Sequence, residues 1–273
     1  MPIVTIASSP LAPHVAPVPI HYRDIGAGPP LLFLHGGWGY DIYPFDRQIE
    51  ALASTSRIVI PDRTGYGGSG RLTAQEADFH QRAAAETFAV IDALGLERPV
   101  VWGHSDGAVI ALLMGLTQPA RLAGLIVEAT HLYRGKPSSR DFFETMMNSP
   151  DALGERVASV LARDHGDEWR DVIRMNGVAW LRIADARATA GEDLYGGRLP
   201  VLRVPTLVVH GAKDPRTEPG ELDALRAALP AARVALVADG GHSPHSERLA
   251  GDAVTAAARG FLAEITRGIG TAR

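Results

Sequence analysis

The sequence predicts an α/β protein with a mostly parallel sheet and helices on both of its faces. Two short runs, residues 30–34 and 57–60, are apolar without alternation, as strands covered on both faces are. Between residues 76 and 94 the apolar side chains Ala84, Phe88 and Ile91 recur at helical spacing. Because such runs and helices alternate along the chain, we expect parallel strands joined by helical crossovers.

The remaining elements continue this alternation. Residues 20–25 alternate well enough for an exposed strand, and Gly95 is placed to end the first helix. The apolar run before Ser105 is followed by a helix over 108–116, which Pro119 stops. Further expected elements are strands over 122–127, 204–210 and 233–237, a helix near 218–229 and a last helix from about 246 to 266.

Residues 131–200 interrupt the alternation. No strand is evident there, whereas 150–163 and 168–187 carry helical stripes of apolar residues. We interpret the segment as a helical lid inserted into one domain, whose core comprises residues 1–130 and 201–273. Its aromatic side chains exceed what two short helices need to pack together, so some should face the core or a substrate.

The composition excludes several classes of protein. A net charge of -4 without clustered Lys and Arg argues against nucleic-acid binding, and the absence of cysteine rules out disulfides and thiolate metal sites. No apolar run approaches the ~20 residues needed to span a bilayer. Residues 1–19 are interrupted by prolines and lack the basic start and apolar centre of a secretion signal. We therefore expect a cytoplasmic protein.

Ser105 occupies the corner between a buried strand and a buried helix. Gly103 and Gly107 stand two residues away from it on either side. A serine at such a sharp turn has a strained backbone, and only residues without bulky side chains fit at those two positions. The two glycines therefore indicate a turn that presents a hydroxyl at the end of the strand.

Three polar side chains follow the carboxyl ends of different predicted strands. They are Ser105, Asp214 and His242, and in open α/β sheets ligands bind at that edge. A serine hydroxyl becomes a good nucleophile when an imidazole takes its proton and a carboxylate orients the imidazole. Glu128, which ends another strand, is an alternative acid, and His245 is an alternative base. We favour Asp214 and His242 because of the motifs around them.

The chain resembles the α/β-hydrolase superfamily over essentially its whole length. Residues 103–107 are similar to the nucleophile elbow of that family, and residues 35–38 are similar to its oxyanion loop. Residues 62–69 resemble the structural loop after its fourth strand, and the order Ser, Asp, His is also the order of the family. The resemblance implies an eight-stranded sheet flanked by helices, with an inserted helical lid.

The resemblance also implies roles for residues around the elbow. By the family pattern, the main-chain N–H groups of Asp106 and of Gly37 or Trp38 stabilise the oxyanion. His35 and His104 lie inside these motifs, and we expect both to be buried and to brace their loops through hydrogen bonds.

Four side chains are candidates for contact with a substrate. The carboxylate of Asp106 is next to the nucleophile and would favour a cationic substrate, or else it faces solvent or stabilises the helix N-terminus. The Ser-Asp-Gly elbow also resembles valacyclovir-hydrolase-like members, which the family associates with amino-acid esters, although Ala108 departs from their second glycine. Trp38 either shapes the pocket or packs against the lid, and Asn176 either reaches a substrate or is a hydrogen-bonded core residue. Tyr133 is the fourth candidate.

Together these features predict a serine hydrolase that cleaves a small carboxylic ester or lactone through an acyl-enzyme. Ser105 attacks, His242 transfers the proton and Asp214 orients His242, without a metal or an organic cofactor. Amidases, carbon–carbon bond hydrolases and cofactor-free haloperoxidases use the same three residue types. The epoxide hydrolases and haloalkane dehalogenases of the family instead use a carboxylate at the position of Ser105. A ligand-binding sensor on the same fold is the non-enzymatic alternative, and both a monomer and a dimer remain open.

Overall fold

In the computed structural model, which describes residues 1–186 and 192–271, eight strands form one sheet. Strand β2 is antiparallel to both of its neighbours, and the other neighbouring pairs are parallel. The predicted fold class, α/β with a mostly parallel eight-stranded sheet, is confirmed. In spatial order the strands are β1 (Ile3–Ile6), β2 (Val18–Ile25), β4 (Arg57–Pro61), β3 (Pro30–Leu34), β5 (Val100–His104), β6 (Gly124–Glu128), β7 (Thr206–Gly211) and β8 (Arg233–Val237).

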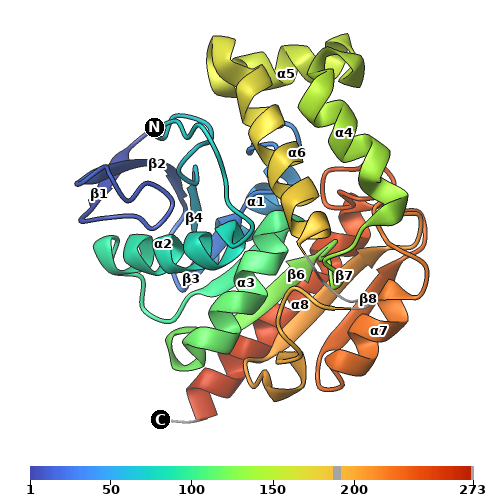
Figure 1. Cartoon of the computed structure of the whole chain (residues 1–273). Helices are drawn as coiled ribbons and strands as arrows, with labels where there is room; N and C mark the ends of the chain where they lie inside the picture. The colour runs from blue at the N-terminus through green and yellow to red at the C-terminus, as the bar shows by residue number, and fades with distance from the viewer. Residues whose placement is uncertain (187–191, 272–273) are drawn as a thin grey trace.

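Helices cover both faces of the sheet (Figure 1). One face carries α2 (Phe79–Ala93), α3 (Asp106–Thr117) and α7 (Glu221–Ala228), and the other carries α1 (Asp46–Leu52) and α8 (Gly251–Thr271). Successive side chains of a strand point to opposite faces. Leu32 of β3 therefore packs in the core with α2 and α3, whereas Leu31 and Phe33 pack in the core with α1 and α8. This two-sided burial explains the uninterrupted apolar runs.

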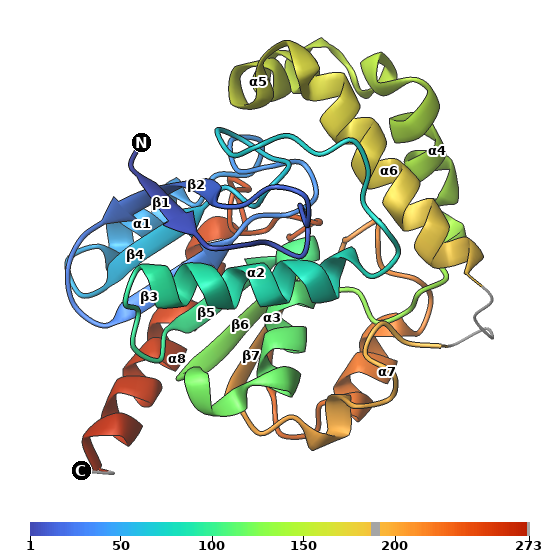
Figure 2. The same cartoon turned by 60° about the vertical axis from the view of Figure 1, so that its left-hand side comes forward.

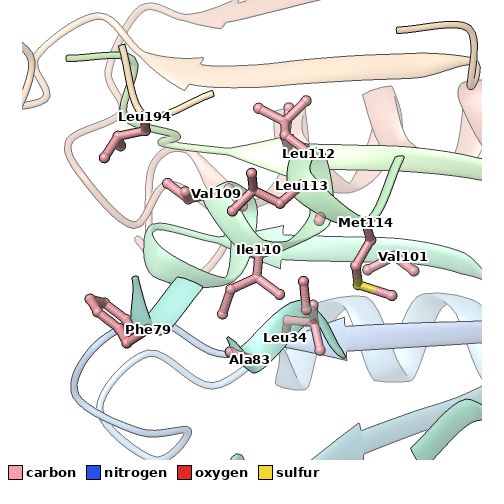
Figure 3. Packing of buried hydrophobic residues seen from close by; sticks show 14 of the residues in the cluster. Leu34, Phe79, Ala83, Val101, Val109, Ile110, Leu112, Leu113, Met114 and Leu194 are labelled. Atoms are coloured by element: carbon pink, nitrogen blue, oxygen red, sulfur yellow. The ribbon is translucent and has the colours of Figure 1, made fainter. Parts of the chain in front are cut away.

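Helix α3 is buried around its whole circumference. Every residue from Asp106 to Gly115 is buried, as expected of a helix that is apolar on all sides. Burial of one leucine side chain stabilises the fold by ~1.5–3 kcal/mol, so this packing holds the start of α3 firmly. Figure 3 shows this core, with the α3 residues Val109, Ile110, Leu112, Leu113 and Met114 among Leu34, Phe79, Ala83, Val101 and Leu194.

Among the described residues, three α-helices lie between β6 and β7, within the segment 131–200 that we call the insertion. They are α4 (Arg140–Asn148), α5 (Glu155–His165) and α6 (Trp169–Asp185). Helix α6 packs against both α4 and α5, and the three lie over the end of the sheet at which α3 begins (Figure 2). The two predicted stripes correspond to α5 and α6, and Arg187, at the end of the second stripe, lies outside the described residues.

Some elements differ from the expectation. Strand β1 lies in the proline-rich segment and pairs with β2, and it was missed because it has only four residues. The short helices α1 and α4 were also missed. The last helix begins at Gly251 rather than near residue 246, because the preceding residues turn, with Ser246 N–H donating to Ser243 O. Among the described residues, no helix is both long and apolar enough to cross a membrane.

Candidate active site

The corner at Ser105 has the strained geometry that its flanking glycines predict. Ser105 has φ 54° and ψ -118°, and residues other than glycine rarely adopt a backbone conformation with such a positive φ. A Cβ on Gly103 would lie 2.0 Å from Gly107 O, and one on Gly107 would lie 2.2 Å from Leu34 O. Because these contacts are with main-chain atoms, only glycine fits at either position, and the steric prediction is confirmed.

A line of hydrogen bonds joins the three predicted catalytic residues. Ser105 Oγ lies 3.0 Å from His242 Nε2, and His242 Nδ1 lies 2.9 Å from Asp214 Oδ2 and 3.0 Å from Oδ1. The three side chains follow β5, β7 and β8 at the same edge of the sheet. With Nδ1–H donating to Asp214, the lone pair of Nε2 faces the Ser105 hydroxyl, which is the arrangement a general base requires.

Asp214 is a buried and ionised acceptor. Burial by itself would raise the pKa of its carboxyl, but the charge and hydrogen bond of His242 and the N–H of Arg216 lower this pKa to about 2. The Arg216 N–H donates to Asp214 Oδ1 over 2.8 Å. The carboxylate is therefore held by the main chain as well as by the imidazole, so its orientation is well defined.

The alternative acid and base, Glu128 and His245, pair with each other. His245 Nδ1 donates to Glu128 Oε1 over 2.7 Å, and Trp102 Nε1 donates to Glu128 Oε2 over 3.1 Å. The second ring nitrogen, Nε2, donates to Tyr43 O over 2.9 Å. Although burial opposes it, the charge and hydrogen bond of His245 lower the pKa of Glu128. The side chains of this pair are fully buried, and Ser105 Oγ is not among their hydrogen-bond partners.

The turn at residues 36–38 lies against the Ser105 corner. A Cβ on Gly36 would be 3.3 Å from Ser105 Cβ, and one on Gly37 would be 2.5 Å from Asn176 Oδ1. The turn is therefore confined between the corner and α6. The Trp38 ring stacks on Phe142 of α4 with a centroid distance of 5.6 Å, so Trp38 packs against the insertion.

Two histidines, His35 and His104, hold loops that surround the site. His35 accepts a hydrogen bond from Arg63 N–H at Nε2 and donates from Nδ1 to Gly36 O. His104 Nε2 donates to His242 O over 2.9 Å, and burial, followed by the neighbouring histidines, lowers its pKa to about 3. The prediction that His35 and His104 are buried and brace their loops is confirmed.

His165, for which the sequence suggests no partner, joins the insertion to the core. Its Nε2 donates to Trp38 O over 2.9 Å, and its Nδ1 accepts from Gly67 N–H over 3.0 Å. The neighbouring Asp164 accepts the N–H groups of Tyr40 and Asp41, each over 3.1 Å. The end of α5 is thus fastened to the core next to the 36–38 turn.

The carboxylate of Asp106 lies in the first turn of α3, as the helix N-terminus alternative expects, and its burial corrects the expectations that it faces a substrate or solvent. Only 1% of Asp106 is exposed, and it accepts hydrogen bonds from His80 Nε2, Asn176 Nδ2 and Trp180 Nε1 at 3.2, 2.8 and 3.0 Å. Burial would raise its pKa, but these bonds and the charge of Arg63, 4.0 Å away, lower it to about 2. The negative charge is stabilised by donors inside the protein, and these hydrogen bonds join α6 and α2 to α3.

The other substrate-binding candidates divide in the structure. Asn176 uses its amide group for Asp106 and is 3% exposed, so it is a hydrogen-bonded core residue that also touches the 36–38 turn. Of the two alternatives predicted for Asn176, the structure shows the hydrogen-bonded core residue and corrects the contact with a substrate. Tyr133 is partly buried, and its N–H donates to Glu221 Oε1 over 3.1 Å. Trp38 is also partly exposed, beside the corner.

His131 and Arg216 lie beside His242 and Asp214, although no pattern in the sequence pointed to either residue. The His131 ring stacks on His242 with a centroid distance of 5.6 Å and meets the edge of Trp180 at 5.0 Å. Burial and the charge of Lys136 hold its pKa well below the usual value, so it is neutral. Its position after β6, at the same edge as Ser105, is the signal that could have identified it.

The described residues offer no metal site, and a hollow that they line lies away from the Ser105 corner. A hollow of about 870 Å³ opens where β3 and β5 begin, and its lining includes Pro30, Val100 and Arg259. Since Ser105 follows the other end of β5, this hollow is remote from the corner. Within residues 1–186 and 192–271, no three His, Cys, Asp or Glu side chains gather in a way that could hold a metal ion.

Known proteins resemble this chain along most of its length. A "Putative carbamate hydrolase RutD" of Azorhizobium caulinodans is 29% identical over 248 residues, which are 84% of this chain and 90% of that protein. The "Serine hydrolase BPHL" of Mus musculus is 25% identical over 250 residues, which are 89% of this chain and 84% of that protein. An esterase from Thermogutta terrifontis has the same fold, with a TM-score of 0.73, 24% identity and coverage of 97% and 99%.

The family itself follows from a match that spans most of the sheet and the whole insertion. The model of the alpha/beta hydrolase family matches residues 31–257, which contain Ser105, Asp214 and His242. The sheet order and the strained corner described above agree with this match. This chain therefore belongs to the alpha/beta hydrolase family.

Proposed function

We propose that the chain is a serine hydrolase that cleaves a small carboxylic ester or lactone through an acyl-enzyme. The observation that carries the proposal is the unbroken line of hydrogen bonds from Ser105 Oγ through His242 to Asp214. The roles that we propose for the three groups are those that acyl transfer requires: a nucleophilic oxygen, a base and a carboxylate that orients the base.

The first half of the reaction forms the acyl-enzyme. Ser105 Oγ attacks the carbonyl carbon while His242 Nε2 takes the hydroxyl proton. The carbonyl oxygen becomes an oxyanion, for which the main-chain N–H groups of Asp106 and of Gly37 or Trp38 are the proposed donors. The carbon–oxygen bond to the alcohol then breaks, and the alcohol leaves with the proton from His242. In a lactone the alcohol stays attached to the acyl group.

The second half uses water. His242 Nε2 removes a proton from the water molecule, whose oxygen attacks the acyl carbon. The bond between this carbon and Ser105 Oγ breaks, the proton returns to Oγ, and the carboxylic acid leaves. Asp214 stabilises the imidazolium in both halves, and its lowered pKa keeps it ionised throughout.

We further propose that the insertion, residues 131–200, acts as a lid on a core made of residues 1–130 and 201–273. Its α4 supplies Phe142, which stacks on Trp38 beside the corner. Trp38 and Tyr133 are the proposed substrate contacts, because both are partly exposed near the point where the insertion meets the core. Since loops and insertions vary while the scaffold persists, these residues should set the size of the acyl group.

Carbamates are a second candidate substrate class. The relative from Azorhizobium caulinodans carries the name of a carbamate hydrolase, and a carbamate carbonyl would be attacked in the same way. Amidase, carbon–carbon bond hydrolase and cofactor-free haloperoxidase activities use the same three residues, so they belong in the same substrate panel. A ligand-binding sensor would keep the pocket without turnover.

A covalent probe tests the proposal directly. Incubation with a fluorophosphonate should add one phosphonyl group to the intact mass, and Ser105→Ala should remain unlabelled. Failure of the wild-type protein to react, or labelling that persists in Ser105→Ala, would refute the serine mechanism. Turnover of p-nitrophenyl acetate, aliphatic lactones, carbamates and amides of graded acyl length would then rank the substrate classes and separate an enzyme from a sensor.

A further inference from the structure

Arg216 places a cation beside the proposed catalytic residues, because its own main-chain N–H donates to Asp214. Its side chain is partly buried, and its guanidinium carbon lies 3.3 Å from the centre of the Phe142 ring. Phe142 stacks on Trp38, and Trp38 in turn stacks on Tyr43 with a centroid distance of 6.3 Å. The Tyr43 ring meets His104, the residue before Ser105, at 5.6 Å. A chain of ring contacts, which we call the aromatic wall, therefore links Arg216 to His104, the residue before Ser105.

The guanidinium has no anionic partner of its own. Within the part of the chain that the structure describes, its N–H groups make no hydrogen bond or ion pair with another side chain. Asp214 is the nearest candidate by sequence, but its oxygens face His242 and the main-chain N–H of Arg216. The negative charge of Asp214 attracts the guanidinium without bonding to it.

Nearby charges that could serve the same purpose are already paired. Lys136 is buried and bonds to Glu221, and Arg63 lies beside the sealed carboxylate of Asp106. Burial disfavours the charged form of Arg216, although an arginine side chain remains protonated in proteins. A partly desolvated cation without a hydrogen-bonded anion is costly, and an incoming anion would offset that cost.

The planar guanidinium fits a carboxylate through two parallel hydrogen bonds. We propose that Arg216 binds a carboxylate group of the substrate, so that the substrate of this hydrolase is an ester or lactone that carries a negative charge. This inference rests on the proposed function, and it reverses the charge preference that the Ser-Asp-Gly elbow suggests. Asp106 is occupied by internal donors, whereas Arg216 has its donors available.

Matched ester pairs measure this preference. The anionic mono-p-nitrophenyl glutarate is compared with the neutral p-nitrophenyl pentanoate, and 4-acetoxybenzoate is compared with its methyl ester, so that the charge lies on the acyl or the alcohol side. We expect kcat/KM to favour the anionic member of one pair by about tenfold, as one partly desolvated charge pair allows. Arg216→Gln should abolish that ratio, and Arg216→Lys should restore part of it. Arg226→Gln, an exposed arginine of α7 that pairs with Asp223 within its own helix, is the matched control and should leave the ratio unchanged.

A binding measurement separates this inference from the proposed reaction. Ser105→Ala is titrated by calorimetry with monomethyl glutarate and with methyl pentanoate, without and with Arg216→Gln. Tighter binding of the anionic ester that depends on Arg216 supports the inference even if no ester is hydrolysed, in which case the proposed function alone fails. Hydrolysis without a charge preference, or a preference that survives Arg216→Gln, overturns the inference and leaves the proposed function intact.

Discussion

Two histidines of one loop, His242 and His245, each pair with a carboxylate. The two pairs differ in the group that lies against the second ring nitrogen of the histidine. In both, Nδ1 of a histidine bonds to a carboxylate: His242 to Asp214 and His245 to Glu128. Nε2 of His242 meets the Ser105 hydroxyl, and 20% of the His242 side chain is exposed. Nε2 of His245 meets the Tyr43 carbonyl, and its side chain is fully buried.

The comparison shows that a carboxylate–imidazole pair is not by itself a catalytic base. A carboxylate–imidazole pair becomes a base only when its free nitrogen faces a group that can lose a proton and when water and substrate can reach it. The Glu128–His245 pair has neither property, and both of its ring nitrogens face acceptors. Its hydrogen bonds join β6 to the loops that carry Tyr43 and His242, so we assign it a positioning role.

The largest expected effect distinguishes the two histidines. His242→Gln should lower kcat/KM by ~10⁴-fold or more while leaving the melting temperature nearly unchanged, because it removes the base. His245→Gln should do the reverse, with a loss of about 3 kcal/mol of stability from the uncompensated Glu128 charge. Ester hydrolysis and thermal unfolding of both variants provide the measurement. A catalytic loss in the folded His245 variant equal to that of the His242 variant would break the comparison.

Substitution of the two acids, Asp214 and Glu128, should likewise affect kcat to different extents. Asp214→Asn should lower kcat by ~10⁴-fold, because an amide no longer holds the imidazole in its productive tautomer. For Glu128→Gln, the loss per folded molecule should stay within about tenfold, since this residue acts through the loop rather than on the reacting atoms. Circular dichroism of both variants supplies the folded fraction. A greater catalytic loss in Glu128→Gln would assign the acid to Glu128 instead.

The free energy of unfolding should depend on pH through the carboxylates of Asp214 and Glu128. The pKa of Asp214 is about 2 and that of Glu128 is also lowered, so the folded protein binds fewer protons than the unfolded chain. Their contribution is complete above the unfolded pKa of ~4 and is lost as pH falls through the folded pKa. For Asp214 the loss is about 2–3 kcal/mol. Urea unfolding between pH 6 and 2 should therefore be less pH-dependent in Asp214→Asn and in Glu128→Gln than in the wild-type protein.

The smallest expected effect concerns another buried carboxylate, that of Asp106. Asp106→Asn keeps the main-chain N–H and should change the rate ratio between α-amino esters and uncharged esters by less than about twofold, because the carboxylate does not reach the substrate. The variant should instead lose stability, since His80, Asn176 and Trp180 lose their acceptor. A selective loss of activity toward α-amino esters would restore the recognition role.

Much of the fold, and the choice of Ser105, Asp214 and His242, follows from local patterns in the sequence. Uninterrupted apolar runs mark strands that are buried on both faces, and the glycines around Ser105 mark a turn that no side chain could enter. The order of Ser105, Asp214 and His242 at strand ends was visible in the same way. Short elements such as β1 and α4 were not, because few residues carry too little periodicity to stand out.

The sequence by itself determined the fold class, the corner at Ser105 and the position of Ser105, Asp214 and His242 at the ends of strands. It could do so because strand periodicity and backbone strain depend on neighbouring residues. Only the tertiary structure decided which acid meets which histidine, that Asp106 is sealed beneath α6, and that Arg216 faces the aromatic wall. These outcomes depend on side chains from distant segments, whose packing directions no local pattern records.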